Sequence, residues 1–372
     1  MKLLITGGHL TPALALLDYV TKQRDKTLFV GRKFSSEYHG IESREKSEVE
    51  NRGATFKSIS TIKFHRHKKI QSILTLPKII FSISRSYKII SDFNPDVIVS
   101  FGGYVAIPIV IAAKIKNIPI FTHEQTITSG LANKIIGVLS DKIGVSWPET
   151  KKHFSQDKVV LTGNPIRQEL RKKSKKPVWV SSDKKIIYIT GGNQGSQSIN
   201  KIVAKSLDDL TKKYYVIHQC GGTGKSHYFH DLNKIKLTLP KSKRTNYTIR
   251  NWFSSEEVSW ILSNSKLIVS RSGANTVTEI IYKGIPAIFI PLPFSGGNEQ
   301  FLNAKVLSDH KAAVIIDQKK LSKNCLLEKI SKIEESYEKF STNSKTLKKI
   351  LVNESEKKIY TQIKKLHENK KK

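Results

Sequence analysis

Cysteine is scarce in this sequence, and no hydrophobic run approaches the length of a membrane-spanning helix. Two cysteines, Cys220 and Cys325, cannot build the disulfide network of a small secreted domain, and they fit a reducing compartment. No CxxC or CxxxH spacing indicates a zinc site. Residues 1–5 lead directly into a predicted strand and a glycine turn, so we expect neither a signal peptide nor a transmembrane helix.

Acidic residues are also few. The 31 Asp and Glu residues against 64 Lys and Arg residues give a formal net charge of +33. Such a charge is compatible with a non-catalytic protein that binds nucleic acid, which we keep as an alternative. Because lysine is spread along the whole chain, a general enrichment in lysine is the simpler interpretation, and we expect no nucleic-acid partner.

Short buried strands, glycine turns and amphipathic helices alternate along most of the 372 residues. The pattern stops at a Gly-Asn-Pro turn, residues 163–165, and then restarts. The chain is long enough for two cores of this kind. We therefore predict an α/β protein with two tandem, Rossmann-like doubly wound domains, residues 1–163 and 164–351, facing a shared cleft.

The segment 270–303 carries the clearest site signal. A buried strand at 266–269 runs into a small-residue turn at 272–276 and then into a helix. A helix N-terminus carries about +0.5 charge, so this turn suits a diphosphate. Glu279 lies further along the helix, where an acid can bind a ribose diol. An ordinary strand–helix–strand unit is the alternative interpretation. Beyond the next strand, a polar loop suited to sugar hydroxyls carries Glu299, Gln300 and Asn303.

Two candidate bases follow predicted strands in the first half. His9 comes directly after the Gly7-Gly8 turn, and a histidine there suits a general base near neutral pH. A capping or packing histidine is the alternative. Glu124 lies in His-Glu-Gln, residues 123–125, at the end of another strand, where doubly wound sheets place their ligands. The sequence alone leaves the choice between His9 and Glu124 open.

Residues 62–93 form a basic segment with interleaved apolar residues. Between Lys63 and Lys88 it contains seven Lys and Arg residues and no acid. Ile80, Phe81 and Tyr87 share helical spacing, and Pro77 predicts a kink or break. A basic amphipathic helix is typical of binding to an anionic membrane surface. The alternative is a helix packed on the core with a solvated basic face.

Seven motifs occur in a fixed order over about residues 1–320: TGGHLTPALAL, FGGYV, HEQ, LTGNPIR, GGNQGSQSIN, SRSGANTVTE and NEQFLNAK. With them the sequence resembles the MurG family of peripheral membrane glycosyltransferases. The resemblance implies a GT-B fold whose C-terminal helix, about 352–372, crosses back to the first domain. It also implies inverting transfer of N-acetylglucosamine from UDP-N-acetylglucosamine to lipid I, without metal or cofactor. This transfer forms lipid II, a peptidoglycan precursor, at the cytoplasmic face of the inner membrane.

The resemblance also implies a role for individual residues. His9 and Glu124 would be catalytic, with His9 the preferred base. The acceptor would meet Gly7, Gly8, Gly102, Gly103, Tyr104, Gln125 and Asn133 in the first domain. The UDP-sugar would meet Arg167, Asn193, Gln194, Gly195, Phe253 (against the uracil), Gly273, Ala274, Asn275, Thr276, Glu279, Glu299, Gln300 and Asn303.

Three motifs depart from the family's usual pattern. The first glycine loop is short, with Thr6 running directly into Gly7-Gly8-His9 where the family usually has GGTGGH. Asn193 and Ser196 replace a serine and an alanine in the third loop, and Thr126 stands where asparagine is usual. Because the shortened loop concerns the acceptor, a related GT-B enzyme that transfers a UDP-sugar to another lipid acceptor is a further alternative.

Overall fold

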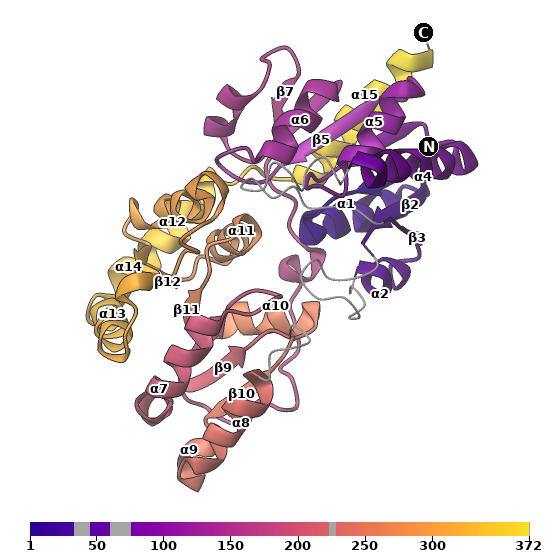
Figure 1. Ribbon diagram of the computed structural model, residues 1–372. Coiled ribbons are helices and arrows are strands. Elements are labelled where there is room, and N and C mark those ends of the chain that lie inside the picture. The colour runs from indigo at the N-terminus through magenta and orange to yellow at the C-terminus, as the bar shows by residue number, and fades with distance from the viewer. Residues whose placement is uncertain (33–44, 60–75, 223–227, 372) are drawn as a thin grey trace. The chain divides into compact units, whose positions relative to one another are not determined.

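The computed structural model describes residues 1–32, 45–59, 76–222 and 228–371, and it divides into two compact units (Figure 1). The first unit comprises Met1–Arg167 and Val352–Lys372, and the second comprises Gln168–Leu351. The division thus falls after Arg167, whereas the sequence prediction placed it at 163–164. Among the described residues, no helix is both long enough and apolar enough to cross a membrane.

The first unit is built on a seven-stranded parallel sheet of order β3-β2-β1-β4-β5-β6-β7. The central strands are buried on both faces, which is why the sequence shows them as continuous apolar runs. The strands are β1 (Lys2–Thr6), β2 (Lys26–Gly31), β3 (Thr55–Ser58), β4 (Val97–Ser100), β5 (Ile120–Glu124), β6 (Lys142–Val145) and β7 (Val159–Leu161).

Helices cover both faces of this sheet. Because side chains alternate along a strand, Leu3 and Ile5 enter the core beneath α1 and α15, and Leu4 enters the core beneath α4 and α5. The C-terminal helix α15 packs against α1 and contributes Ile359 and Ile363 to the first of these cores. The helices are α1 (Leu10–Lys22), α2 (Glu45–Glu50), α4 (Leu76–Phe93), α5 (Ile107–Ile115), α6 (Leu131–Leu139) and α15 (Ser355–Lys371).

The second unit has a six-stranded parallel sheet of order β10-β9-β8-β11-β12-β13. The strands are β8 (Ile186–Thr190), β9 (Tyr215–Gln219), β10 (Tyr247–Arg250), β11 (Ser265–Ser270), β12 (Ala287–Phe289) and β13 (Ala313–Ile315). Its helices are α7 (Gln197–Lys213), α8 (Tyr228–Thr238), α9 (Lys241–Arg244), α10 (Ser255–Asn264), α11 (Ala274–Lys283), α12 (Glu299–Ser308), α13 (Lys323–Glu335) and α14 (Tyr337–Thr346).

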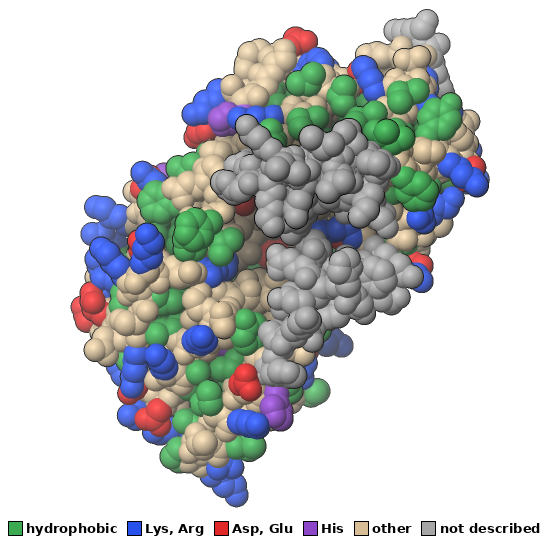
Figure 2. Space-filling model, in the orientation of Figure 1, with side chains coloured by type: hydrophobic (Ala, Val, Ile, Leu, Met, Phe, Trp, Pro, Cys, Tyr) green, Lys and Arg blue, Asp and Glu red, His purple; other side chains and the backbone are tan. Residues whose placement is uncertain are grey.

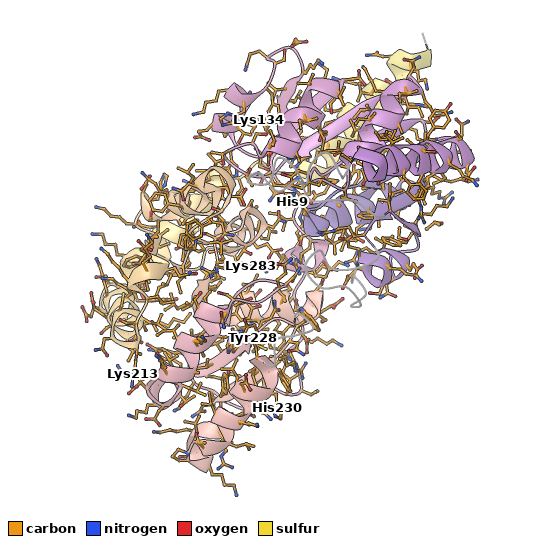
Figure 3. The ribbon with its side chains drawn as sticks, in the orientation of Figure 1. His9, Lys134, Lys213, Tyr228, His230 and Lys283 are labelled. Carbon is orange, nitrogen blue, oxygen red and sulfur yellow. The ribbon has the colours of Figure 1, made fainter. Side chains whose placement is uncertain are left out.

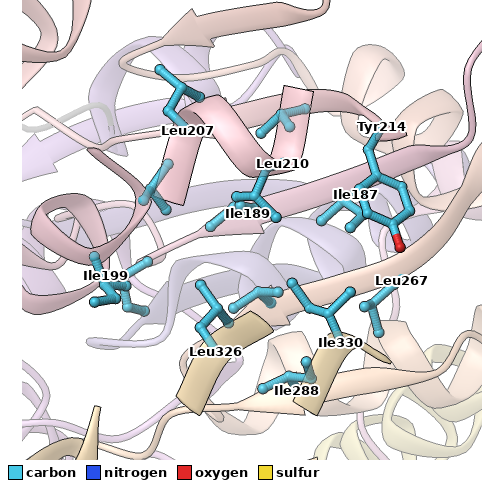
Figure 4. Packing of buried hydrophobic residues seen from close by; sticks show 14 of the residues in the cluster. Ile187, Ile189, Ile199, Leu207, Leu210, Tyr214, Leu267, Ile288, Leu326 and Ile330 are labelled. Atoms are coloured by element: carbon cyan, nitrogen blue, oxygen red, sulfur yellow. The ribbon is translucent and has the colours of Figure 1, made fainter. Parts of the chain in front are cut away.

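One core of the second unit lies between the sheet, α7 and α13. Ile187 and Ile189 of β8 pack with Leu207 of α7 and with Leu326 and Ile330 of α13 (Figure 4). Short 3₁₀ helices complete the two units at Pro148–His153, Gln168–Arg171, Gly296–Asn298, Gln318–Lys320 and Leu347–Ile350.

The strand orders identify where each sheet can bind a ligand. In the first sheet β1 lies between β2 and β4, and in the second sheet β8 lies between β9 and β11. At each of these points the strand order reverses, and doubly wound sheets bind their ligands at such points, beyond the carboxyl ends of the strands. The glycine turns of the sequence fall on these loops.

The beginnings of α10 and α4 follow from their first residues. The N-cap of α10 is Ser254, because the Ser254 hydroxyl accepts the Glu257 backbone N–H while the Glu257 side chain accepts the Ser254 N–H. α4 begins at Leu76 and has Pro77 in its first turn, where a proline lacks only an N–H that the helix does not use. The residues just before Leu76 are not described, so the predicted kink or break at Pro77 stays a prediction. The rest of the predicted basic segment, residues 62–75, lies outside the described residues.

Candidate active site

The first two glycine turns touch each other beyond the ends of β1 and β4. The Gly8 N–H donates to the Gly102 carbonyl oxygen at 2.7 Å. A Cβ atom on Gly7 would lie 2.7 Å from the Phe101 Cβ atom, and one on Gly103 would lie 3.1 Å from the Gly8 Cα atom. Larger residues would therefore force the two turns apart, so the glycines hold two loops in contact at the reversal point of the first sheet.

His9 is presented from this pair of turns with a defined tautomer (Figure 3). Its Nδ1 atom lies 3.1 Å from the Phe101 carbonyl oxygen. A carbonyl oxygen can only accept, so Nδ1 carries the proton and Nε2 of the neutral ring keeps its lone pair. The side chain is half-buried, and His9 is also the N-cap of α1 without making a side-chain cap hydrogen bond. This arrangement suits a general base acting through Nε2.

Glu124, the competing candidate, is buried and already occupied by hydrogen bonds. Its Oε1 atom accepts from the Thr126 N–H at 3.0 Å and from the Thr126 hydroxyl at 2.8 Å. Its Oε2 atom accepts from the Asn133 amide at 2.7 Å, and Asn133 in turn accepts the Gly103 N–H at 3.3 Å. The carboxylate therefore positions Asn133 and the second glycine turn, and the geometry favours His9 as the base.

The same hydrogen bonds explain two features of the sequence. Thr126, which departs from the family's asparagine, supplies both a backbone and a hydroxyl donor to Glu124. An added Cβ atom at Gly102 would lie 2.0 Å from Asn133 Oδ1, so the glycine makes room for the amide. Tyr104 lies on the same loop and is half-buried.

Gln125 is turned into the protein. It is fully buried, and its amide nitrogen donates to the ring of His123 at 3.0 Å and to the His123 carbonyl at 3.0 Å. His123 Nε2 donates to the Gly163 carbonyl at 2.9 Å. Burial lowers the pKa of His123 to about 4, so the ring is neutral at physiological pH. In this orientation the Gln125 amide faces the protein interior. Direct contact between Gln125 and the acceptor stays a prediction.

In the second unit the loop after β8 exposes Asn193 and Gln194. The Trp252 indole N–H donates to the Asn193 carbonyl at 2.9 Å. Gly195 has φ +78°, and a Cβ atom there would lie 2.2 Å from the Cys220 carbonyl oxygen. The loop thus rests directly on the backbone that follows β9, and only glycine fits at the point of contact.

The loop after β11 leads into α11, whose N-cap is Gly273 and makes no side-chain cap hydrogen bond. A glycine at the N-cap brings no side chain of its own to the first-turn N–H groups of Ala274, Asn275 and Thr276, and such a helix start suits an anion. Asn303 donates its amide to the Ser272 carbonyl at 3.2 Å, and its buried Oδ1 atom has no partner among the described residues. Glu279 lies further along α11 and is buried.

Arg271 was missed by the sequence analysis. Its guanidinium donates to the side chains of Ser196 and Ser198 at 2.7 and 2.9 Å, and to the Ile290 carbonyl at 2.8 Å. It also reaches the Gln318 side chain at 2.6 Å. Burial lowers the pKa of Arg271 to about 10, so the group stays charged at neutral pH. An arginine immediately after a buried strand and before a glycine turn was the available signal.

Phe253 is largely covered by other aromatic rings. Its ring centroid lies 5.3 Å from that of Trp179 and 6.4 Å from that of Tyr188, and the residue is 5 % exposed. Arg250 lies over the Trp179 ring and pairs with Glu257 at 2.8 Å. The cluster leaves only a narrow edge of Phe253, so its predicted contact with uracil stays a prediction.

The predicted sugar loop follows β12. Gln300 Oε1 accepts the Leu292 N–H at 3.0 Å, which closes the loop onto itself. Glu299 is half-buried at the first position of α12. Arg167, the last residue of the first unit before the division, is half-buried, and its predicted donor contact stays a prediction. Within the described parts of the chain, no group of three or more His, Cys, Asp and Glu side chains is placed to hold a metal ion.

Known proteins resemble the chain over nearly its whole length. Residues 6–145 match the glycosyltransferase family 28 N-terminal domain, and residues 186–366 match the C-terminal domain. A "UDP-N-acetylglucosamine--N-acetylmuramyl-(pentapeptide) pyrophosphoryl-undecaprenol N-acetylglucosamine transferase" of Clostridium tetani is 31 % identical, over 92 % of this chain and 93 % of the relative. The Bacillus subtilis protein of the same name is 32 % identical, with 92 % and 93 % covered. The chain belongs to glycosyltransferase family 28 and, within it, to the MurG family.

Solved structures support the fold of a MurG-family chain. The crystal structure of Acinetobacter baumannii MurG is similar with a TM-score of 0.69 at 22 % identity, covering 98 % of this chain and 99 % of that one. The calicheamicin glycosyltransferase CalG4 is similar with a TM-score of 0.68 at 10 % identity, with 98 % of each chain covered. The predicted GT-B fold with two Rossmann-like domains is confirmed, and the chain is a glycosyltransferase.

Proposed function

We propose that this enzyme transfers N-acetylglucosamine from UDP-N-acetylglucosamine to lipid I, with inversion at the anomeric carbon, and so makes lipid II for peptidoglycan. The names of the curated relatives support the donor and the acceptor. The single observation that carries the mechanism is the hydrogen bond from His9 Nδ1 to the Phe101 carbonyl, which leaves Nε2 as the basic nitrogen.

The chemistry requires one base and one stabilised leaving group. The acceptor hydroxyl attacks the anomeric carbon from the face opposite UDP, and His9 Nε2 takes its proton. A new glycosidic C–O bond forms as the bond from the anomeric carbon to the diphosphate oxygen breaks, and UDP leaves with the electron pair. Glu124 and Asn133 keep the second glycine turn in place through the Gly103 N–H.

The second unit would hold the donor. The N-terminus of α11, which begins at a glycine cap, and the loop 191–196 would offer backbone N–H groups to the diphosphate. Arg271 adds a half-buried positive charge whose hydrogen-bond partners among the described residues are neutral oxygens. Such fixed dipoles and charge stabilise the leaving diphosphate without the reorganisation that water requires. Glu279 would bind the ribose, and Gln300, Asn303 and Glu299 the sugar.

The first unit would bind an anionic membrane surface through α4, α5 and α6. These helices lie side by side, and hydrophobic side chains are exposed among Lys and Arg over them (Figure 2). Ile80 and Phe81, near the beginning of α4, are each 65 % exposed, whereas Ile89 and Ile90, near its end, are buried in the core. Large apolar residues exposed at one end of a core-packed helix are suited to the membrane interface. We infer a peripheral location at the cytoplasmic face of the membrane.

The exposed apolar face continues across the other two helices. Ile115 of α5 is 61 % exposed and Val138 of α6 is 77 % exposed. Lys134 lies on the exposed side of α6 (Figure 3), and Lys116 sits over the Tyr87 ring at 4.5 Å. Lysines among exposed apolar side chains match the negative charge of the lipid headgroups.

Transfer of radiolabelled N-acetylglucosamine to a short-chain lipid I analogue tests the function. Wild-type protein and Glu279→Ala are compared with UDP-N-acetylglucosamine and with UDP-glucose. We expect transfer from UDP-N-acetylglucosamine, and a KM for it raised about tenfold or more in Glu279→Ala, since a charge-assisted pair of hydrogen bonds is removed. Donor binding without transfer to lipid I, followed by transfer to another polyprenyl acceptor, would instead support the related GT-B alternative.

A further inference from the structure

A chain of buried hydrogen bonds lies beneath the loop 191–196 and ends on the backbone that supports it. It begins at Tyr247, the first residue of β10, passes through His218 of β9 and Asn200 of α7, and ends at the Cys220 carbonyl. The three side chains are 1 %, 0 % and 2 % exposed. None of them belongs to the site described above.

The direction of each hydrogen bond follows from one fixed group. The Cys220 carbonyl can only accept, so Asn200 Nδ2 donates to it at 2.9 Å. Asn200 Oδ1 then faces His218 Nε2 at 3.0 Å, which must be the N–H donor. His218 Nδ1 therefore has a lone pair and accepts the Tyr247 hydroxyl at 2.9 Å. Every donor and acceptor along the chain is matched when His218 is neutral, and burial lowers its pKa to about 3.

The carbonyl at the end of this chain supports the loop above it. An added Cβ atom on Gly195 would lie 2.2 Å from the Cys220 oxygen, and one on Gly221 would lie 2.2 Å from the Gly195 nitrogen. The Asn200 N–H donates to the Ser196 carbonyl at 2.8 Å, which ties the last residue of the loop to the same asparagine. A shift of Asn200 or Cys220 would therefore move the loop.

We propose that His218 and Asn200 are positioning residues that hold the loop 191–196 in the shape that receives the donor diphosphate, through the Cys220 carbonyl. The inference rests on the proposed function for the identity of the ligand, and on the geometry for the positioning itself. Neither residue reaches the surface of the loop, so both act through other groups. The two residues should therefore affect the affinity for the phosphates of the ligand and not the affinity for its nucleoside.

The variants are His218→Leu, which removes both ring nitrogens, and Asn200→Asp, which replaces the donor to Cys220 by an oxygen of similar shape. His218→Gln keeps an N–H group for Asn200 and serves as the rescue variant. Thr211→Val is the matched control, because its hydroxyl is equally buried at the other end of α7 and donates to the Leu207 carbonyl at 2.7 Å. Titration calorimetry measures the affinity of each protein for UDP and for uridine.

We expect His218→Leu and Asn200→Asp to bind UDP about tenfold or more weakly, since each leaves a buried polar group unsatisfied and releases the loop. Uridine affinity should stay within about twofold, and His218→Gln should recover most of the UDP affinity. KM for the UDP-sugar should rise while KM for the acceptor does not change. Unchanged UDP affinity in folded His218→Leu, or an equal loss for UDP and uridine, would overturn the proposal.

Hydrogen exchange in the free protein tests, without a ligand, whether His218 holds the loop 191–196 in place. The amides of Gly192 and Gly195 are bonded to Thr190 Oγ1 and to the Gly192 carbonyl, and should exchange faster in His218→Leu. The Tyr214 amide at the far end of α7 should keep its rate. Wild-type protein that does not bind UDP contradicts the proposed function, whereas unchanged exchange at Gly192 and Gly195 contradicts the positioning.

Discussion

The glycine loops that follow β1 and β8 occupy equivalent places in the two sheets but carry different charges. The loop after β1 ends in His9, whose imidazole is half-buried with Nε2 available. The loop after β8 ends in Ser196, and His218, which is linked to the backbone under this loop through Asn200, is fully buried and neutral. Arg271, a cation, bonds to Ser196. Under the proposed function, one scaffold would support proton transfer in the first unit and charge stabilisation in the second.

The largest expected effect concerns the base. His9→Ala should lower kcat by about 10²- to 10⁴-fold, because the acceptor hydroxyl loses its proton acceptor. UDP affinity should not change, since His9 belongs to the first unit. Steady-state kinetics and UDP titration measure the two quantities. In Glu124→Gln we expect mainly a raised KM for the acceptor; a loss of kcat as large as that of His9→Ala, with normal acceptor binding, would make Glu124 the base.

Burial of His218 in the second unit should make the free energy of unfolding depend on pH. Folding lowers the pKa of His218 from 6.5 to about 3, so below pH 6.5 the unfolded state binds a proton that the folded state does not. Stability from this residue is complete above pH 6.5 and falls toward pH 3. Between pH 8 and pH 5 the free energy of unfolding should fall by about 2 kcal/mol because of His218. This pH-dependent part should be absent in His218→Gln. Urea unfolding at both pH values measures it.

The exposed His230 of α8 provides the control for that comparison. His230→Gln should leave the difference in unfolding free energy between pH 8 and pH 5 as it is in the wild type, because folding does not bury this side chain. Equal behaviour of the two variants would mean that burial of His218 does not govern its protonation.

Substitution of Arg271 tests whether a cation in the second unit contributes to UDP binding. Arg271→Met should weaken UDP binding about tenfold or more while uridine binding is retained, since the cation acts on the phosphates. Arg244→Met is the control, because Arg244 is half-buried in the same unit and donates to the Leu239 carbonyl at 2.7 Å. Calorimetric titration at two salt concentrations gives the affinities. If Arg271→Met and Arg244→Met bind UDP equally well, the half-buried charge of Arg271 has only a structural role.

An exposed phenylalanine in each unit tests whether membrane binding is confined to the first. Phe81 of α4 is 65 % exposed, and Phe294 beyond β12 is 91 % exposed. Phe81→Ser should weaken binding to vesicles that contain anionic lipid about fivefold, because one aromatic ring no longer enters the interface. Phe294→Ser should bind as the wild type does. Co-sedimentation distinguishes the two, and a larger loss in Phe294→Ser would move the membrane surface to the second unit.

The smallest expected effect concerns helix capping. α10 begins with a side-chain cap, whereas the N-cap of α11 is a glycine. Ser254→Ala should destabilise the protein by about 1 kcal/mol, since Ser254 caps α10 through the Glu257 N–H. Ser255→Ala should change the unfolding free energy by less than about 0.5 kcal/mol. Neither variant should change UDP affinity, because the helix end assigned to the diphosphate is that of α11. Chemical denaturation gives the stabilities, and a larger loss in Ser255→Ala than in Ser254→Ala would show that Ser255 is the cap.

The strands were predictable from the sequence because the sheets are buried on both faces. Short continuous apolar runs such as 97–100 and 186–190 are typical of strands that are buried on both faces of a parallel sheet. Glycine turns at strand ends were predictable for a similar reason, since close backbone contact excludes other residues at Gly7 and Gly195. Local composition was enough for these features.

The directions of individual side chains were not predictable. Gln125 follows a strand end, as a ligand-binding residue would, but the imidazole of His123 turns its amide inward. Arg271 is one basic residue among many in the sequence, and its role depends on Ser196 and Gln318, which are distant along the chain. Such contacts arise only when the sheet brings separate segments together, so one sequence does not reveal them.

The membership of α15 in the first unit has a consequence for synthesis on the ribosome. Ile359, Ile363 and Leu366 complete a core whose other members come from residues 1–121. Residues 168–351 emerge earlier and form a unit of their own. The second unit can therefore finish folding while the first still exposes an apolar face, and the first is sealed only when the last helix leaves the ribosome. A chain stopped a few turns early would have an intact second unit and an open first one.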